Sequence, residues 1–526
     1  MLAFERHIAR GDANPQQVNR FLKANSEKLN EVLLEALPLV FTKLTAHELP
    51  DTRQQIARLF VNFAAFLVEF PQGDRLVNIE LSLSACQLAL KILTREAFPE
   101  DWATTQNNLG NAYSNRIRGE RAENIERAIA TYEFALQVRT REAFPEDWAT
   151  IQNNLGAAYF DRIRGERAEN IERAIATYEF ALQVRTREAF PEDWAATQNN
   201  LGAAYSNRIR GERAENIERA IAAYELALQV RTHEAFPENW AATQSNLGDA
   251  YRDQVQGKQT ENLNQAILNY KQASQVLTRH AYPLKWAQNQ GHLAEALIKY
   301  AALTQEGESL DQAITLLQSA LEIAAPGSPD FIDSQYRLGT ALSRRYEHNQ
   351  DQNDLQQALV AYQAALNAIS LEHYDRNQMW QAIPETQSIL GQRLVYDGQW
   401  QQGLQLLLNS VNQLSTSDNR LAHAGSLYQV GYAHETLSDW NNARLYYRDA
   451  LRLYKHLKNQ PGIAKSHAGL GGVLVSQGHL QKGMDELQEA HQIYEDLGQP
   501  DQIASIDNVY QAAKKAMERQ AIEVYV

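Results

Sequence analysis

Pairs of polar residues recur at a spacing of 46 residues in the first half of the chain. They are the asparagines at 107–108, 153–154 and 199–200, with serine and asparagine at 245–246 in a fourth copy. A carboxamide both donates and accepts hydrogen bonds, so Asn107, Asn153 and Asn199 could hold the backbone of an extended peptide whatever its side chains. The sequence leaves open the alternative that either set of amides bonds a neighbouring helix.

A second candidate set consists of the positions that change between copies. Residues 102–147 and 148–193 differ at only four of 46 positions, and three of these differences lie on one predicted helix face: Asn111/Ala157, Ser114/Phe160 and Asn115/Asp161. The third and fourth copies vary there again, with Ala203, Ser206, Asn207, Asp249, Arg252 and Asp253. We hypothesise that this face binds a ligand whose successive segments differ. The alternatives are drift at unconstrained surface positions and, for Phe160, a contact within its own repeat.

Residues suited to covalent or metal chemistry are sparse. Cys86 is the only cysteine, which excludes an internal disulfide, a CxxC redox pair and a thiolate zinc cluster. The 13 histidines form no HExxH motif. The glycine-rich segment 469–472 lacks the preceding strand that a nucleotide-binding loop requires. We therefore expect no catalytic residue, no cofactor and no metal.

Composition narrows the possible partners. The 526 residues carry a formal net charge of −14, which disfavours binding to a phosphate backbone. The N-terminal residues are charged where a secretory signal needs an apolar core, and no stretch reaches the roughly 18 apolar residues of a membrane span. A single cysteine fits a reducing compartment. We expect a soluble cytoplasmic protein that binds neither nucleic acid nor a membrane.

Two amphipathic helices in each unit would position these residues. Tryptophans at 102, 148, 194, 240 and 286 mark the period. Gly119 can end the first helix of a unit, and Pro145 fits the first turn of the next. We expect the tryptophans in the core, and the arginine-rich loops at 116–124 to form a solvated, self-neutralising surface. The predicted apolar stripes comprise Trp102, Leu109 and Tyr113 in the first helix and Ala128, Ile129, Tyr132, Ala135 and Leu136 in the second.

The stripes resemble the tetratricopeptide repeat, which has Leu-Gly-x-x-Tyr in its first helix and Ala-x-x-x-Tyr-x-x-Ala in its second. The first pattern is present at 109–113 and recurs from 155, 201 and 247. The resemblance implies an all-α, right-handed α-solenoid of about ten helix pairs, capped by helices at both ends, whose first helices line a concave groove. The long repeats are similar to bacterial, especially cyanobacterial, arrays often associated with CHAT domains, and to kinesin light chain repeats, which bind peptides.

The same template predicts four segments. Residues 1–51 form an N-terminal helical cap, 52–369 an array of long repeats, 370–499 a sub-array of repeats of about 40 residues, and 500–526 a capping helix and tail. In the degenerate first unit, Cys86 occupies the position of the second-helix tyrosine and is expected in the core. Pro384 is expected to open a helix after an irregular step near 370–387.

We interpret the chain as a non-catalytic scaffold that binds an extended peptide or a partner helix in the groove. The alternative is a regulatory or sensor subunit that controls a separate effector, such as a CHAT-type protease. The expected partner is a protein or peptide, and a homo-oligomer is possible. The predicted contact residues are Asn107, Asn111, Ser114, Asn115, Asn153, Phe160, Asp161, Asn199, Asn207, Asp249, Arg252 and Asp253.

Overall fold

The computed structural model describes residues 20, 22–369 and 376–525, and it describes side chains for all of these except 376–381 and 520–525. The described part contains helices and no strand, so the predicted all-α class is confirmed. The chain forms two compact units, Met1–Val276 and Leu277–Val526. The predicted segment limits, among them 369/370, and the right-handed sense of the solenoid remain predictions.

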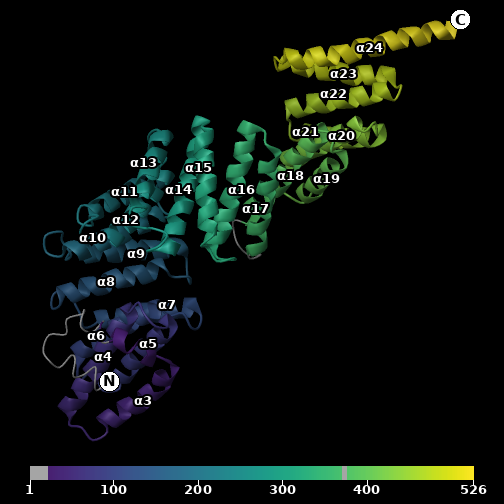
Figure 1. Ribbon diagram of the computed structural model, residues 1–526. Coiled ribbons are helices and arrows are strands. Elements are labelled where there is room, and N and C mark those ends of the chain that lie inside the picture. Colours follow the sequence, from purple (N-terminus) through teal and green to yellow (C-terminus); the bar gives the residue numbers. More distant parts are fainter. Residues whose placement is uncertain (1–19, 21, 370–375, 526) are drawn as a thin grey trace. The chain divides into compact units, whose positions relative to one another are not determined.

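The first unit stacks antiparallel helix pairs (Figure 1). In each pair we call the first helix the A helix and the second the B helix. A short 3-10 helix, Ser26–Lys28, precedes them. The α-helices are α3 (Glu31–Thr45), α4 (Pro50–Glu69), α5 (Arg75–Ala89), α6 (Pro99–Ser114), α7 (Arg121–Leu136), α8 (Pro145–Phe160), α9 (Arg167–Leu182), α10 (Pro191–Ser206), α11 (Arg213–Leu228), α12 (Pro237–Asp253) and α13 (Gln259–Ala273).

The predicted proline starts hold in the long repeats, but the first helix of the unit ends at Ser114 and not at Gly119. Each A helix from α6 to α12 begins at a proline, followed by one or two acidic residues in its first turn. Gly119 adopts φ 79°, a conformation that favours glycine, in the loop between α6 and α7. Asn124 closes this loop by donating from Nδ2 to the carbonyl of Arg118 at 2.9 Å. The same glycine and asparagine recur in the next three copies.

The core of each repeat forms where the glycine of the A helix meets the tyrosine of the B helix. A Cβ atom at Gly110 would lie 2.5 Å from the ring of Tyr132, so only glycine lets the two helices approach this closely. Leu109 and Tyr113 are buried as predicted. The tryptophans, in contrast, are only half-buried. Trp102 packs against Phe134, with the ring centroids 6.4 Å apart. The guanidinium carbon of Arg95 lies 5.6 Å from the centroid of the Trp102 ring.

In the degenerate first unit, the predicted core position of Cys86 is confirmed. Cys86 in α5 is fully buried, and burial raises the pKa of its thiol to about 12. A thiol with so high a pKa carries almost no thiolate near neutral pH and is therefore a poor nucleophile.

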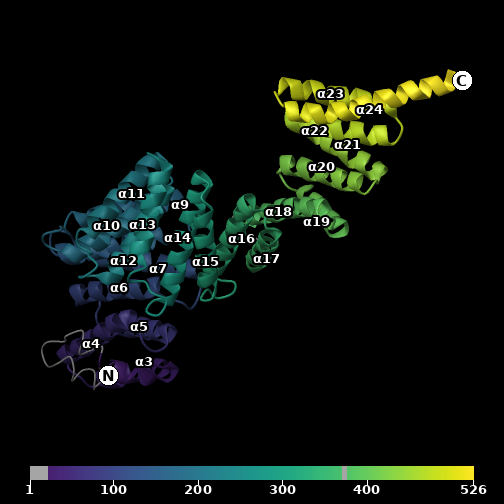
Figure 2. The ribbon, with the colours of Figure 1, turned by 45° about the horizontal axis from the view of Figure 1, so that its top comes forward.

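The second unit continues the antiparallel pairing, and Figure 2 shows its last helices as successive layers. Pro384 was predicted to open a helix, but it lies inside α18. Its carbonyl accepts a hydrogen bond from Ser410 Oγ at 2.7 Å, which links α18 to α19. The helices are α14 (Pro283–Thr304), α15 (Gly307–Leu321), α16 (Pro329–Asn349), α17 (Gln352–Ala368), α18 (Arg376–Tyr396), α19 (Trp400–Leu414), α20 (Arg420–Thr436), α21 (Trp440–His456), α22 (Gln460–Ser476), α23 (Leu480–Asp496) and α24 (Pro500–Tyr525).

Candidate functional site

The predicted contact residues lie on or at the ends of four A helices, α6, α8, α10 and α12. Helices α6, α8 and α10 each contact the A helix of the next repeat, so the fold brings the predicted positions together as one row of side chains. The contacts of these side chains then separate those that join repeats from those that keep a free hydrogen-bonding group.

The asparagine pairs form a ladder between repeats. Asn154 donates from Nδ2 to Oδ1 of Asn107 at 3.4 Å. The same bond joins Asn200 to Asn153 and Asn246 to Asn199, each at 3.2 Å. Asn154, Asn200 and Asn246 therefore bond the neighbouring A helix, which is the alternative that the sequence left open. The first asparagine gives up only its oxygen to the ladder.

The Nδ2 groups of that first set remain available. Within the described residues, Asn107 and Asn199 donate no hydrogen bond from Nδ2, and Asn153 makes only a 3.5 Å contact with its neighbour Asn154. All three side chains are half-buried. The ladder thus fixes the orientation of each amide and leaves its donor unused.

In two copies, the residue two positions after the repeat leucine accepts a hydrogen bond from the tyrosine of the B helix. Tyr132 donates its hydroxyl to Asn111 Oδ1 at 2.7 Å, and Tyr270 donates to Asp249 Oδ1 at the same distance. Arg252 also pairs with Asp249 at 2.8 Å. Asn111 and Asp249 therefore satisfy buried tyrosine hydroxyls, and neither presents a free carboxamide or carboxylate.

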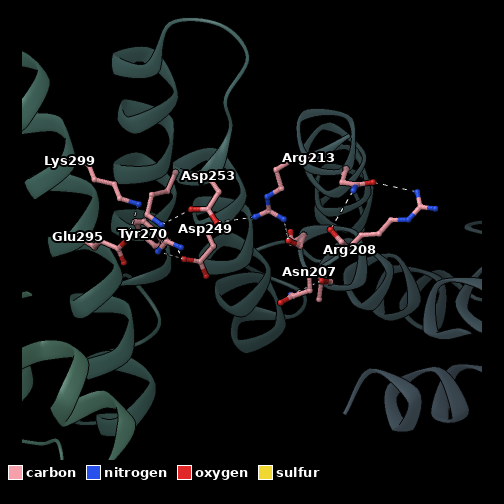
Figure 3. A network of polar contacts seen from close by, with 12 residues as sticks. Asn207, Arg208, Arg213, Asp249, Asp253, Tyr270, Glu295 and Lys299 are labelled. Atoms are coloured by element: carbon pink, nitrogen blue, oxygen red, sulfur yellow. Dashed lines mark hydrogen bonds and ion pairs between the residues drawn. The ribbon is translucent and has the colours of Figure 1, made fainter. Parts of the chain in front are cut away.

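The residues at the ends of the A helices join adjacent repeats. Arg213 pairs with Asp253 at 3.4 Å (Figure 3). Arg121 pairs with Asp161 at 2.9 Å. Asn115 accepts a hydrogen bond from Arg75 at 3.2 Å. Asn207 instead donates to the carbonyl of Ala203 in its own helix. These contacts give Asp161 and Asp253 a structural partner before any ligand is considered.

The remaining variable position is more diverse. Ser114 and Ser206 have buried hydroxyl oxygens without a hydrogen-bond partner. Phe160 is half-buried, and the guanidinium of Arg167 lies 5.0 Å from its ring centroid. The contact of Phe160 within its own repeat, left open as an alternative, is therefore present.

The arginine-rich loops carry a second set of cross-repeat contacts. Arg162 binds both carboxylate oxygens of Glu126 at 2.8 Å, and this hydrogen bonding holds the pKa of Glu126 below its ordinary value. Equivalent pairs join Arg116 to Glu80 and Arg208 to Glu172. In the fourth copy Gln254 replaces the arginine and donates one bond to Glu218. These loop arginines are thus neutralised by glutamates of the preceding repeat.

Sequence reasoning missed a set of buried arginines where each B helix ends. Arg185 and Arg231 are only 6% and 8% exposed. Their counterpart Arg139 lines a small cavity of about 60 Å³, together with residues of two A helices that include Asn107. The available signal was the appearance of arginine at a position where the outer copies have Leu93 and Leu277.

The second unit contains a larger cavity, of about 480 Å³, that the sequence did not predict. It lies among the A helices α16, α18 and α20, and Tyr396 beside it is 72% exposed. The lining residues are Tyr346, Gln350, Ile389, Gln392, Arg393, Tyr396 and Tyr432.

The described residues contain neither a cluster suited to a metal ion nor a helix suited to a membrane. No cluster of three or more histidine, cysteine, aspartate or glutamate side chains is arranged to hold a metal ion there. None of the described helices combines the length and apolar character needed to cross a bilayer.

Comparison with known proteins identifies the repeat. Residues 102–137, 148–183 and 194–234 match a family model described as tetratricopeptide repeat. No curated protein matches the chain.

Two solved structures to which the chain has a low similarity are the following. One is the C-terminal part of a TPR repeat-containing protein from Cytophaga hutchinsonii, with 13% identity, a TM-score of 0.35, and coverage of 60% of this chain and 98% of that one. The other is a signal transduction ATPase with numerous domains and a tetratricopeptide repeat sensor from Pyrococcus horikoshii, with 13% identity, a TM-score of 0.42, and coverage of 95% and 74%. The three matched segments, with their repeated glycine–tyrosine helix pairs, are therefore tetratricopeptide repeats within the first unit.

Proposed function

We propose that the chain is a non-catalytic scaffold that binds an extended peptide of a partner protein along α6, α8 and α10. The observation that carries this proposal is the row of Asn107, Asn153 and Asn199, whose oxygens are held by the next repeat while their Nδ2 groups keep a donor for a ligand. A peptide backbone presents carbonyl acceptors whatever its sequence, so such a row suits an extended chain.

Several repeats must act together for useful affinity. One neutral hydrogen bond contributes about 0.5–1.5 kcal/mol net. Three such bonds, with side-chain contacts at the variable positions, give an affinity that depends on all three repeats being in register. The regular 46-residue spacing supports this arrangement because it repeats the donor at equivalent places along successive A helices.

The ladder allows ligand binding to be separated from packing. Replacing Asn107, Asn153 and Asn199 together by Asp keeps the oxygen that each ladder bond needs, and it replaces the free donor by a second, negatively charged acceptor. We expect this variant to lose binding to peptides selected from a random-sequence library by the wild-type protein. Its helicity and thermal unfolding should remain close to wild type.

A matched control removes the other half of the ladder. Replacing Asn154, Asn200 and Asn246 together by Ala deletes the cross-repeat bonds and leaves the first asparagines in place. This variant should unfold more easily yet still bind the selected peptides at low temperature. Unchanged peptide affinity in the Asp variant would reject the proposal. Loss of binding on Tyr396→Ala instead would move the site to the cavity in the second unit.

A further inference from the structure

Arg231 is a buried charge at a position that normally holds an apolar side chain. It is 8% exposed, and the equivalent residues of the outer copies are Leu93, fully buried, and Leu277, 3% exposed. Burying a guanidinium costs several kcal/mol unless a carboxylate or several hydrogen bonds compensate it. An arginine at this position therefore requires partners.

At the two preceding junctions those partners are present. Arg139 pairs with Asp147 at 3.1 Å, and Arg185 lies 3.4 Å from Asp193. Threonine hydroxyls complete each set: Thr104 at 3.2 Å for Arg139, and Thr150 and Thr197, both at 3.0 Å, for Arg185. In both cases the carboxylate comes from the first turn of the next A helix.

At the third junction the carboxylate and one hydroxyl are missing. Asn239 takes the position of Asp147 and Asp193, and Ala196 takes the position of Thr104 and Thr150. Arg231 keeps one bond, from Nη1 to Thr243 Oγ1 at 3.1 Å, and its buried Nε has no partner. Burial lowers the pKa of Arg231, and Glu192 opposes this only in part.

We propose that the Arg231 corner, formed by Ala196, Asn199, Arg231, Asn239 and Thr243, binds a carboxylate of the bound peptide. The ligand carboxylate would take the place that Asp147 and Asp193 fill at the preceding junctions. The corner adjoins the proposed peptide row, since the equivalent residues at the first junction line one cavity with Asn107. The inference rests on the proposed function for the source of the carboxylate. The negative charge of the ligand group is inferred from the uncompensated guanidinium of Arg231.

A carboxylate fits this corner better than a phosphate. The site replaces one carboxylate with its single charge, as the two preceding junctions show. Glu192, in the first turn of α10, interacts with Arg231 and would repel a second negative charge. The ligand group is therefore an aspartate or glutamate side chain, or a free C-terminus.

The test uses peptides selected by the full-length wild-type protein from a random-sequence library. We expect an acidic residue at one fixed place in these peptides. Changing that acid to its amide should weaken binding about tenfold, which is the size of one charge-assisted bond. Asn239→Asp supplies the carboxylate internally, so it should bind the acid and amide peptides equally. Arg231→Leu, which restores the residue of the outer copies, should do the same.

A gain-of-function control comes from the second junction. Asp193→Asn vacates the equivalent corner beside Arg185, so peptides selected by this variant should show an additional acidic preference. Selected peptides without any acidic preference, or an acid-to-amide ratio unchanged by Asn239→Asp, would overturn the inference while leaving the scaffold proposal intact.

Thermal unfolding separates the two proposals if no peptide binds. Acetate at constant ionic strength should then raise the unfolding temperature of the wild type more than that of Asn239→Asp. Such a difference would support a carboxylate site and reject the peptide as its source. Equal shifts would reject the site itself, and a larger shift with inorganic phosphate than with acetate would reject the assignment to a carboxylate.

Discussion

The repeats of the first unit and the helix pairs α18–α23 of the second unit are joined in different ways. In the first unit, loops and helix ends supply polar side chains to the neighbouring repeat, as in the pair of Arg162 and Glu126. In the pairs α18–α19 and α22–α23, glycines bring the two helices into backbone contact, whereas Gly431 of α20 meets the ring of Tyr447. A Cβ at Gly403 would lie 2.6 Å from the carbonyl oxygen of Gly391, and one at Gly471 would lie 2.9 Å from that of Gly483. The longer repeats thus use their extra residues to bond a neighbour, and the shorter ones rely on close packing.

The largest expected difference concerns these glycines. Gly403→Ala would press a methyl group against backbone, which cannot turn aside, and should cost about 3 kcal/mol, the upper end for overpacking. Gly202→Ala meets the ring of Tyr224 at 2.8 Å, which can shift, and should cost about 1–2 kcal/mol. Hydrogen exchange of the affected helices in the full chain measures both. Equal losses would show that the two kinds of joint do not differ in rigidity.

The next effect tests the polar joints. Glu126→Gln should destabilise α7–α9 by about 1 kcal/mol because it breaks a two-bond ion pair that is only a quarter exposed. Glu123→Gln, in the same helix, removes an exposed pair with Arg127 and should cost less than about 0.5 kcal/mol. Since the pKa of Glu126 is lowered, its contribution is present above the ordinary glutamate value of 4.5 and is lost as the pH falls through the folded value. Below that range the Gln variant should match wild type; a cost that persists there would contradict the ion-pair explanation.

An effect of opposite sign is expected in the second unit. Burial raises the pKa of Glu435 above its ordinary value, so the protonated form stabilises the folded state and its advantage is lost as the pH rises. Glu435→Gln mimics the protonated form and can still accept the hydroxyl of Tyr447, which lies 2.5 Å away. It should stabilise α20 and α21 at pH 7 by about 0.5–1 kcal/mol and change little at pH 4. Destabilisation at pH 7, measured by hydrogen exchange, would contradict this.

The smallest effect is expected when the arginine–glutamate pair that is missing in the fourth copy is restored. Gln254→Arg should restore the two-bond pair with Glu218 that the three preceding copies have with their glutamates. We expect α11 and α12 to gain about 0.5 kcal/mol, an effect to be measured by hydrogen exchange against Gln256→Arg as the control for added charge. A gain of the same size in both variants would indicate a general charge effect.

Much of the fold was predictable because the copies are nearly identical. The period located the helix starts at Pro145 and its equivalents, the turn at Gly119, and the contact of Leu109 and Tyr113 with the core. A helix face can be derived from residue spacing alone. The place of Pro384 inside α18 could not be derived in this way, because its segment lies outside the near-identical copies.

The candidate site was less predictable, because its groups meet only across repeats. The sequence identified the asparagine row but could not decide which amide bonds its neighbour, since that choice depends on the stacking of α6, α8 and α10. Asp161 and Asp253 were expected to contact a ligand, whereas the structure pairs them with Arg121 and Arg213. Arg231 escaped notice because its missing partners are visible only by comparison with Arg139 and Arg185 in three dimensions.

The cross-repeat pairs also have a mechanical consequence. The pair of Arg162 with Glu126 links residues 36 positions apart, and the pair of Arg121 with Asp161 links residues 40 positions apart, so each ties a repeat only to its neighbour. Pulling on the ends of this unit would load such links in series, and repeats would be released one after another. Each release would free 46 residues, or about 150 Å of extended chain. The near-identical copies would then extend in equal steps, and a repeat with a weaker link, such as the one at Gln254, would open first.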